Sequence, residues 1–418
     1  MWRRLLGVAL LGSSLALTPS AQAAFGAPVL GPQRVLVVMV TWGPEPFTQD
    51  EARHVVFDQA DAFYRSSSYG KASITGTVTP WLHALAAPPG CSTTFFIALR
   101  TAASAAAAAA GYDPGAYDRV IFLHPDAGCP WSGVTYAATI FLNGALTRRL
   151  VAHELGHSFG LAHANTTSCR RHGCGAIEYG DPYDTMGEGT GDFSAKAKLT
   201  LGWLTKIPRA SVNRVYTLEP LERPAAGGQA LNVTTANDEY WIEYRSEPAR
   251  DEAGKLLAGP GVVVHVSPSP DVRGPGSSTL GNVLLDDPAG RKRPELRPGD
   301  RFSDPGAFTL TVLKQAGSRA RLRFKWTDAV APRVPQLMTE VVGGSLQLTV
   351  GSPHDTGSGV DSYSVTLDGR TALRLGIDEI DEPVRVGRPL PGTHTLSVVA
   401  IDRAGNRSVA ATRRIRIP

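Results

Sequence analysis

The chain has 418 residues, more than a single typical domain of about 100–200 residues, so two or three domains are expected. Its hydrophobic content of 42% and charged content of 19% are those of a globular protein that buries a core. The formal net charge of +4 is too small for a nucleic-acid-binding surface, and we expect no nucleic-acid partner.

The first 23 residues have the three parts of an export signal. The basic start MWRR is followed by the apolar run LLGVALLGSSLAL, and Ala21-Gln22-Ala23 fits a small-residue cleavage site. The apolar run is shorter than the roughly 20 residues that span a membrane, and no later run is long and apolar enough either. We therefore expect residues 1–23 to be a signal peptide, and the mature protein to be secreted without a membrane span.

The four cysteines gain a meaning from export. An even count in an oxidising compartment predicts two disulfides, for which three pairings exist. In the short segment CRRHGC, Cys169 and Cys174 are close enough to clip a loop, which favours pairing Cys91 with Cys129. The alternative for this segment is a Cys/His metal site that includes His172.

Up to about residue 165, strands alternate with helices, which predicts an α/β layer. Apolar or alternating runs predict strands at 34–42, 72–82, 118–125 and 133–144, the last holding one or two strands. Thr48 is a candidate N-cap for a helix over 48–70. The alanine-rich run 101–110 predicts another helix, which ends at Gly111.

After Trp203 the pattern changes to short alternating segments that are separated by Gly, Pro and Asp turns. No long helical period is present there. We therefore expect an α/β domain over 24–206, a β-rich domain over 207–327, a linker over 328–335 and an Ig-like β-sandwich over 336–418.

The segment AHELGHSFGLAH places three histidines and one glutamate close together. His153 and His157 are four residues apart, so on a helix both imidazoles lie on one face, with Glu154 alongside. Gly160 lets the chain leave the helix through a left-handed conformation, after which His163 can return to the same metal. Three neutral imidazoles leave the fourth tetrahedral position of a zinc ion open for water.

Two other interpretations compete with a catalytic metal centre. Neighbouring histidines can be ordinary core or surface residues, and a structural zinc site can also contain histidine. A structural site uses four protein ligands, however, and this cluster supplies three histidines. Glu154 favours catalysis, because a carboxylate beside the metal can take the proton of the bound water.

HELGHSFGLAH resembles the HExxHxxGxxH pattern of the metzincin metallopeptidases. Further along, YGDPYDTMG over 179–187 resembles their Met-turn, in which a methionine forms a floor beneath the metal. This wording, followed by FSAKAKLTLGWL, is similar to the gametolysin-like peptidases, bacterial members included, as is the upstream SSSYGKASITGTVTPWL. The resemblance is specific over roughly residues 35–205, weaker through 212–326 and absent beyond.

The resemblance implies a metzincin-type α/β catalytic domain, a mixed sheet with an active-site helix. It implies that one catalytic Zn²⁺ is bound by His153, His157 and His163. It also implies that Glu154 is the general base and that Met186 is structural.

One family feature is absent. Some members place a tyrosine ligand two residues after the Met-turn methionine, and here that position is Glu188. Tyr179 and Tyr183 precede the methionine, where they either pack or stabilise an oxyanion.

The expected function is that of a secreted zinc-dependent endopeptidase, which hydrolyses extracellular proteins with Glu154 as general base. We expect an edge strand within 131–142 to pair with the extended substrate. The alternative is a surface-binding or adhesion protein with a degenerate or highly restricted peptidase domain, against which the intact Glu154 argues. The sandwich either binds a cell-wall or matrix polymer or spaces the catalytic domain. Asp-rich turns leave room for calcium, but no complete calcium-loop motif supports it.

Overall fold

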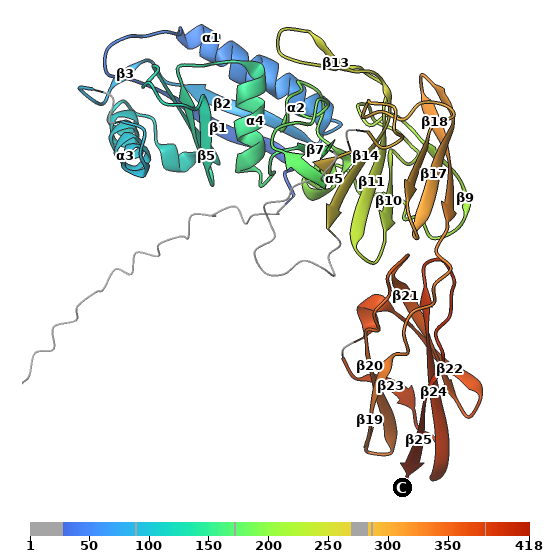
Figure 1. The fold of residues 1–418 in the computed structure, drawn as a ribbon. Coiled ribbons are helices and arrows are strands. Elements are labelled where there is room, and N and C mark those ends of the chain that lie inside the picture. Colours follow the sequence, from blue (N-terminus) through green and yellow to red (C-terminus); the bar gives the residue numbers. More distant parts are fainter. Residues whose placement is uncertain (1–27, 88–89, 171–172, 269–282, 286, 381) are drawn as a thin grey trace, which may run out of the picture.

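The computed structural model describes residues 28–87, 90–170, 173–268, 283–285, 287–380 and 382–418. Its hydrophobic cores follow one another along the chain. Figure 1 shows an α/β body in the N-terminal part, a β-rich body beside it, and an all-β body at the C-terminal end. In the described ranges, no helix has the length and apolar character needed to cross a membrane. The predicted signal peptide lies outside the described residues.

The first sheet is mixed and has the strand order β2-β1-β4-β6-β5. Its strands are β1 (Gly31–Thr41), β2 (Ala72–Val78), β4 (Arg119–His124), β5 (Gly133–Tyr136) and β6 (Thr139–Asn143), while β3 (Leu82–His83) pairs with the end of β1. The strands β2, β1, β4 and β6 run parallel, whereas β5 runs antiparallel to β6 and forms an edge of the sheet. The run predicted over 133–144 is therefore two strands.

Helices cover both faces of this sheet, and the side chains of β1 alternate between the two cores that result. Val37 lies in the core that contains Leu155, whereas Leu36 lies in the core that contains Phe95. Burial on both faces explains why β1 reads as a continuous apolar run in the sequence.

A continuous helical segment follows β1. It consists of α1 (Gln49–Arg53), the π-helical η1 (His54–Ala60) and α2 (Asp61–Ser67). The predicted N-cap is present: Thr48 Oγ1 accepts a hydrogen bond from Glu51 N at 3.1 Å, and Glu51 Oε2 accepts one from Thr48 N at 2.6 Å. This reciprocal capping box satisfies two backbone donors that have no partner inside the helix.

The alanine-rich helix is longer than its composition suggests. Helix α3 (Thr93–Ala109) begins well before residue 101, because Phe95, Leu99 and Ala103 continue one buried face with helical spacing. The predicted end is correct, since Gly111 follows the helix with φ +87°. A short 3₁₀ turn, η2 (Pro114–Ala116), leads on to β4.

A disulfide joins Cys91, just before α3, to Cys129, with a Cα–Cα distance of 5.5 Å. This is the pairing favoured from the sequence. Cys169 and Cys174 are register partners in a hairpin, but their side chains and His172 lie outside the described residues. Both interpretations of that segment stay predictions.

The middle body contains two sheets, with strand orders β10-β11-β14-β15-β7-β8 and β16-β17-β18-β9, and the hairpin β12-β13. The strands are β7 (Asn165–Arg170), β8 (Gly173–Ile177), β9 (Arg214–Leu218), β10 (Ala230–Thr234), β11 (Asp238–Arg245), β12 (Ala249–Arg250), β13 (Leu256–Ala258), β14 (Gly261–Pro268), β15 (Val283–Leu284), β16 (Arg301–Asp304), β17 (Phe308–Ala316) and β18 (Arg319–Trp326). The sequence did not predict β7 and β8, nor the short helix α5 (Ala195–Thr200).

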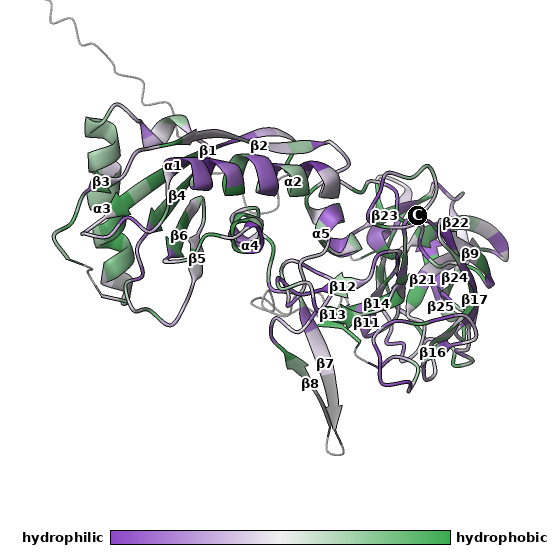
Figure 2. Cartoon of the chain, turned by 90° about the horizontal axis from the view of Figure 1, so that it is seen from above, coloured by the Kyte–Doolittle hydropathy of each residue, from purple (hydrophilic) through white to green (hydrophobic). Residues whose placement is uncertain are grey.

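The hairpin β7–β8 connects the first two bodies. Its first strand pairs in parallel with β15, with Asn165 opposite Val283, so a segment expected in the α/β domain extends the sheet of the next body. In Figure 2 the hairpin projects away from the rest of the chain.

The C-terminal body is a two-sheet antiparallel sandwich of the predicted Ig-like kind. One sheet has the order β19-β20-β23 and the other β22-β21-β24-β25. The strands are β19 (Gln336–Val342), β20 (Ser345–Gly351), β21 (Val360–Leu367), β22 (Arg370–Gly376), β23 (Val384–Gly387), β24 (Gly392–Asp402) and β25 (Ala411–Ile417), with the 3₁₀ turn η5 (Ile377–Glu379) after β22. Apolar side chains such as Leu348, Tyr363 and Val398 fill the space between the sheets.

Candidate metal centre

Helix α4 (Arg148–Ser158) carries the first two histidines. Hydrogen bonds hold it at its N-terminus and at Ala152. Thr147 Oγ1 accepts a hydrogen bond from Leu150 N at 3.2 Å and so caps the N-terminus. The buried hydroxyl of Tyr64 in α2 donates to Ala152 O at 2.7 Å. The helix is therefore fixed to its neighbour as well as packed against the sheet.

The end of α4 turns the chain back towards the helix. Gly160 has φ +92°, the left-handed conformation predicted for it. Gly160 N donates to His157 O at 2.9 Å, and Leu161 N donates to Gly156 O at 3.0 Å. These two bonds form a Schellman motif, which reverses the chain direction within a few residues and brings the next segment beside the helix.

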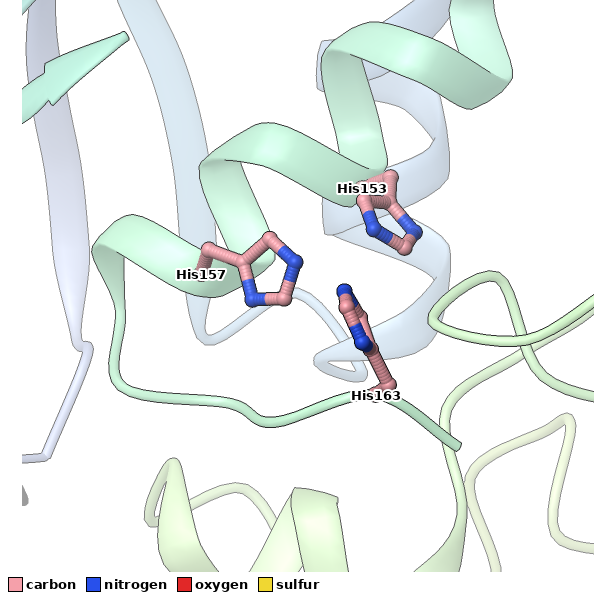
Figure 3. Close-up of side chains that lie close together, drawn as sticks. All are labelled: His153, His157 and His163. Atoms are coloured by element: carbon pink, nitrogen blue, oxygen red, sulfur yellow. The ribbon is translucent and has the colours of Figure 1, made fainter. Parts of the chain in front are cut away.

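Three imidazoles converge where this segment passes the helix. Figure 3 shows His153 and His157 on the helix and His163 on the chain that returns beside it. One ring nitrogen from each lies within 4.8 Å of the others. His153 is buried, while His157 and His163 are partly exposed, so the cluster lies at an accessible surface. This spacing suits three ligands of a single metal ion.

Each imidazole has its Nδ1 engaged by an oxygen atom. The acceptors are Thr185 O at 3.0 Å from His153, Leu161 O at 2.8 Å from His157, and Glu178 Oε1 at 2.6 Å from His163. A carbonyl can only accept, so in the first two histidines Nδ1 carries the hydrogen and Nε2 keeps its lone pair. Metal-binding histidines are commonly oriented in this way, by an acceptor on the other ring nitrogen.

The protonation of the cluster also fits a metal. Burial lowers the pKa of His153 to about 3, and burial likewise lowers the pKa of His157. Both rings are then neutral at ordinary pH, as a ligand must be. Imidazole nitrogens arranged with one open side are the donor set that zinc prefers in catalytic sites.

Glu154 lies beside the histidines with only 4% of its surface exposed. Burial raises its pKa to about 7, against the opposing effect of a hydrogen bond from Thr135 Oγ1 to Oε2 at 2.6 Å. The backbone of Gly133 lies so close that a Cβ there would be 2.5 Å from Glu154 Oε1. Gly133 and Thr135 are alternate residues of the edge strand β5, so the same face of that strand holds the carboxylate.

Met186 packs against α4 at Gly156, which lies between His153 and His157 in the sequence. It is 1% exposed, and its Sδ would lie 2.5 Å from a Cβ on Gly156. Its turn is fixed on both sides: Met186 N donates to Asp184 Oδ1 at 2.8 Å, and Ala164 N donates to Met186 O at 3.0 Å. The close approach of Met186 to the helix therefore depends on a glycine that the sequence motif leaves variable. Its role as a floor beneath a metal stays a prediction.

Replacing Gly156 by Ala should destabilise the fold by about 1–3 kcal/mol, because the added methyl group overlaps Met186. Helix propensity alone predicts the opposite sign, a gain of roughly 0.5–1 kcal/mol. Urea unfolding of the variant tests this. Met186→Ala is itself destabilising, but the double variant Gly156→Ala/Met186→Ala should lose less stability than the sum of the two single losses, because the overlap is gone. A stability gain in Gly156→Ala would contradict the close contact.

The two tyrosines before Met186 differ in position. The ring of Tyr179 contacts that of His163 in a tilted arrangement with a centroid distance of 3.8 Å, and Tyr179 is 43% exposed. Tyr183 is buried, and its hydroxyl donates to Gly259 O at 2.6 Å, so it packs the first body against the second. Glu188 is exposed and does not belong to the cluster of histidine ligand atoms.

Comparisons with known proteins place the chain in context. The model of the family described as gametolysin peptidase M11 matches residues 42–255. No curated protein matches significantly. The match spans the helix with its histidines, the Met-turn and the start of the β-rich body.

Solved structures show only distant similarity. The chain covers 43% of the spore cortex lytic enzyme SleM of Clostridium perfringens, with 14% identity over 30% of this chain and a TM-score of 0.20. It covers 97% of a two-domain fibronectin type-III segment of chicken tenascin, with 10% identity over 45% of this chain and a TM-score of 0.20. It covers 98% of the PKD1 domain of the Vibrio cholerae metalloprotease PrtV, with 15% identity over 21% of this chain and a TM-score of 0.17. Because these scores are low, the assignment rests on the family match.

Proposed function

Because the chain belongs to the gametolysin family of peptidases, M11, we propose that it is a zinc-dependent endopeptidase with a metzincin-type catalytic domain. The observation that carries the proposal is the convergence of His153, His157 and His163 beside the buried carboxylate of Glu154. Their Nδ1 atoms are engaged, which leaves three Nε2 atoms to hold one zinc ion.

Zinc bound by these imidazoles would polarise the scissile carbonyl and lower the pKa of a water molecule towards about 7. The carboxylate of Glu154 would take a proton from an attacking water and then give a proton to the leaving amine. Thr135 and Gly133 keep the carboxylate in position, through the hydrogen bond to Oε2 and the close backbone contact. The low exposure of Glu154 keeps bulk water from competing for the proton.

The substrate backbone is proposed to lie along β5, the antiparallel edge strand within the segment expected from the sequence. One side of β5 pairs with β6, and no described strand pairs with its other side, which could add an extended peptide by main-chain hydrogen bonds. Since Gly133 and Thr135 of this strand contact Glu154, a peptide paired with β5 would pass close to the base. This arrangement requires an unfolded segment in the substrate.

We further propose that the enzyme is secreted, on the basis of the export signal predicted over residues 1–23. A polymer ligand for the C-terminal sandwich stays a prediction.

The function is tested by incubating the protein recovered from culture medium with an unstructured protein such as casein, and identifying the products by mass spectrometry. An endopeptidase produces new termini inside the substrate, and a tightly folded protein should resist cleavage. Shortening from the chain ends would indicate an exopeptidase, and intact casein in the presence of zinc would contradict the proposal. N-terminal sequencing of the same sample shows whether the chain begins at Ala24, as the predicted signal requires.

Replacing Gly133 by Ala should lower kcat on a peptide substrate by roughly 10²-fold, because the new methyl group displaces the carboxylate of Glu154. Zinc content should stay at the level of the unaltered chain, since the three atoms nearest to the added Cβ all belong to Glu154. The matched control is Gly43→Ala, where a Cβ would meet nothing within 4 Å. Equal rates for the two variants would show that Glu154 needs no such exact placement.

A further inference from the structure

A second group of metal-ligand atoms lies far from the histidines, where the β-rich body meets the sandwich. Asp328 follows β18, Asp355 lies in the connection between β20 and β21, and Asp402 ends β24. Their side chains are 9%, 8% and 2% exposed, and one carboxylate oxygen from each lies within 4.8 Å of the others. Three acidic side chains are thus buried together.

Two of these carboxylates are well supplied with hydrogen bonds. Asp328 Oδ2 accepts from Ser358 N and from Ser358 Oγ, both at 2.7 Å. Asp402 Oδ1 accepts from Asn406 N at 2.8 Å, and its Oδ2 accepts from Asn406 Nδ2 at 2.9 Å. These bonds orient the side chains but bring no positive charge.

The third carboxylate is different. Asp355 Oδ2 accepts from Gly359 N at 2.6 Å, whereas its Oδ1 is buried without a hydrogen-bond partner among the described residues. A buried carboxylate oxygen without a partner is destabilising, because it has lost its hydrogen bonds to water. Such an atom beside two other buried carboxylates is where a cation would bind.

The charge balance points the same way. Among the ion pairs between described side chains, none includes any of the three aspartates. The guanidinium of Arg403 donates to Ser358 O at 3.1 Å. Three buried acids that form no ion pair with a described side chain are stable together only when they are protonated or when a cation binds.

We propose that Asp328, Asp355 and Asp402 bind one calcium ion, which joins the sandwich to the β-rich body. Carboxylate oxygens are hard ligands, and calcium accepts them in flexible arrangements of six to eight oxygens, whereas magnesium demands near-ideal octahedral geometry. The sequence shows no calcium-loop motif because the three aspartates come from separate connections, brought together only by the fold.

The location gives the ion a structural role. Asp328 belongs to the segment that leaves the β-rich body, and the other two aspartates belong to the sandwich. Nearby, Ala236 N of the β-rich body donates to Gly357 O of the sandwich at 3.0 Å. A Cβ on Gly357 would lie 2.4 Å from Asp328 Cγ, so the two bodies are in close contact here. Calcium would hold this junction rigid, independently of the peptidase reaction.

Calorimetric titration of the full chain with calcium chloride tests the proposal. The chain is first passed over chelating resin to remove bound metals and then given one equivalent of zinc to fill the histidine site. We expect one calcium ion per chain, and loss of that binding in Asp355→Asn and Asp402→Asn. The matched control is Asp361→Asn, which removes the same charge from an exposed position of β21 and should bind calcium normally. No binding by the unaltered chain, or binding kept by both cluster variants, would overturn the proposal. Magnesium that binds equally well would overturn the assignment to calcium.

A melting experiment separates a metal site from ordinary hydrogen bonding. In EGTA, Asp355→Asn should melt no lower than the unaltered chain. Its amide oxygen can still accept from Gly359 N, and the substitution removes a buried charge that is repelled by its neighbours. Calcium at a concentration of 100 Kd should stabilise the unaltered chain by about 2.7 kcal/mol, which raises its melting temperature, and should leave the variant unchanged. A variant that melts lower by the same amount with and without calcium would show that Asp355 acts only in the packing and hydrogen bonds of the junction, against the proposal.

Discussion

Replacing Glu154 by Gln is expected to reduce kcat on casein or a quenched peptide by about 10²–10⁴-fold, with one zinc ion per chain still bound. Glutamine has nearly the same shape, and its amide oxygen can accept the hydrogen bond from Thr135 that the carboxylate oxygen accepts now. It cannot take a proton from water. Because the three imidazoles are oriented by other groups, the metal site itself should be unchanged.

Initial rates and the zinc content of the purified variant measure this effect. The matched control is Glu188→Gln, which removes a carboxylate from an exposed position two residues beyond Met186. It should keep the full rate. A Glu154→Gln chain that cleaves peptides within a few-fold of the unaltered rate would contradict the role of general base.

Replacing Arg245 by Met is expected to have the largest effect on stability. Arg245 in β11 is 1% exposed, and its Nε donates to Glu243 Oε1 at 2.7 Å. Its Nη1 donates to Asp192 O at 2.9 Å, in the segment that follows the Met-turn. Methionine would fill most of the volume of the arginine side chain, but the buried carboxylate of Glu243 would lose its paired guanidinium. Breaking a buried ion pair in this way costs about 3–5 kcal/mol.

The effect should extend to the metal centre because Glu243 also fixes the first body. Its Oε2 accepts from Ala195 N at 2.7 Å, at the start of α5. The other cationic group near Glu243 is His265, at 3.9 Å, but its Nε2 is engaged by Asp181 at 2.8 Å. A loosened segment here should weaken zinc binding as well as the fold.

Urea unfolding of Arg245→Met compares it with Arg223→Met. Arg223 pairs with Glu247 at 3.4 Å, but the two side chains are 55% and 65% exposed, so the loss there should be below about 1 kcal/mol. Similar losses for the two variants would mean that the buried pair does not hold the two bodies together.

The sequence predicted the parts of the site that depend on local spacing. Residues four apart on a helix share a face in any fold. A glycine that follows a helix commonly takes the left-handed conformation, as Gly160 does here. The helix N-cap at Thr48 and the strand content of residues 133–144 are local for the same reason. These predictions needed no knowledge of the rest of the chain.

The parts that were not predicted depend on contacts between distant segments. Thr135 in β5 donates to Glu154 in α4, and Glu178 accepts from His163. Of these two partners, only Thr135 had a signal in the sequence, since it lies in a segment predicted to be a strand. The pairing of β7 with β15 joins residues far apart in the chain, so local propensity carries no signal for it. Helix α3 began earlier than expected because Phe95 is buried, a tertiary effect that outweighed composition.

The metal centre is tested most directly by a zinc titration of the metal-free full chain, with the rate of casein cleavage followed at each addition. We expect the rate to rise in proportion to zinc up to one equivalent and then to level off, and a His157→Ala chain to stay inactive throughout. Cleavage that is already complete without zinc, or a chain that binds one equivalent of zinc and cleaves no unstructured protein, would contradict a zinc endopeptidase centred on His153, His157 and His163.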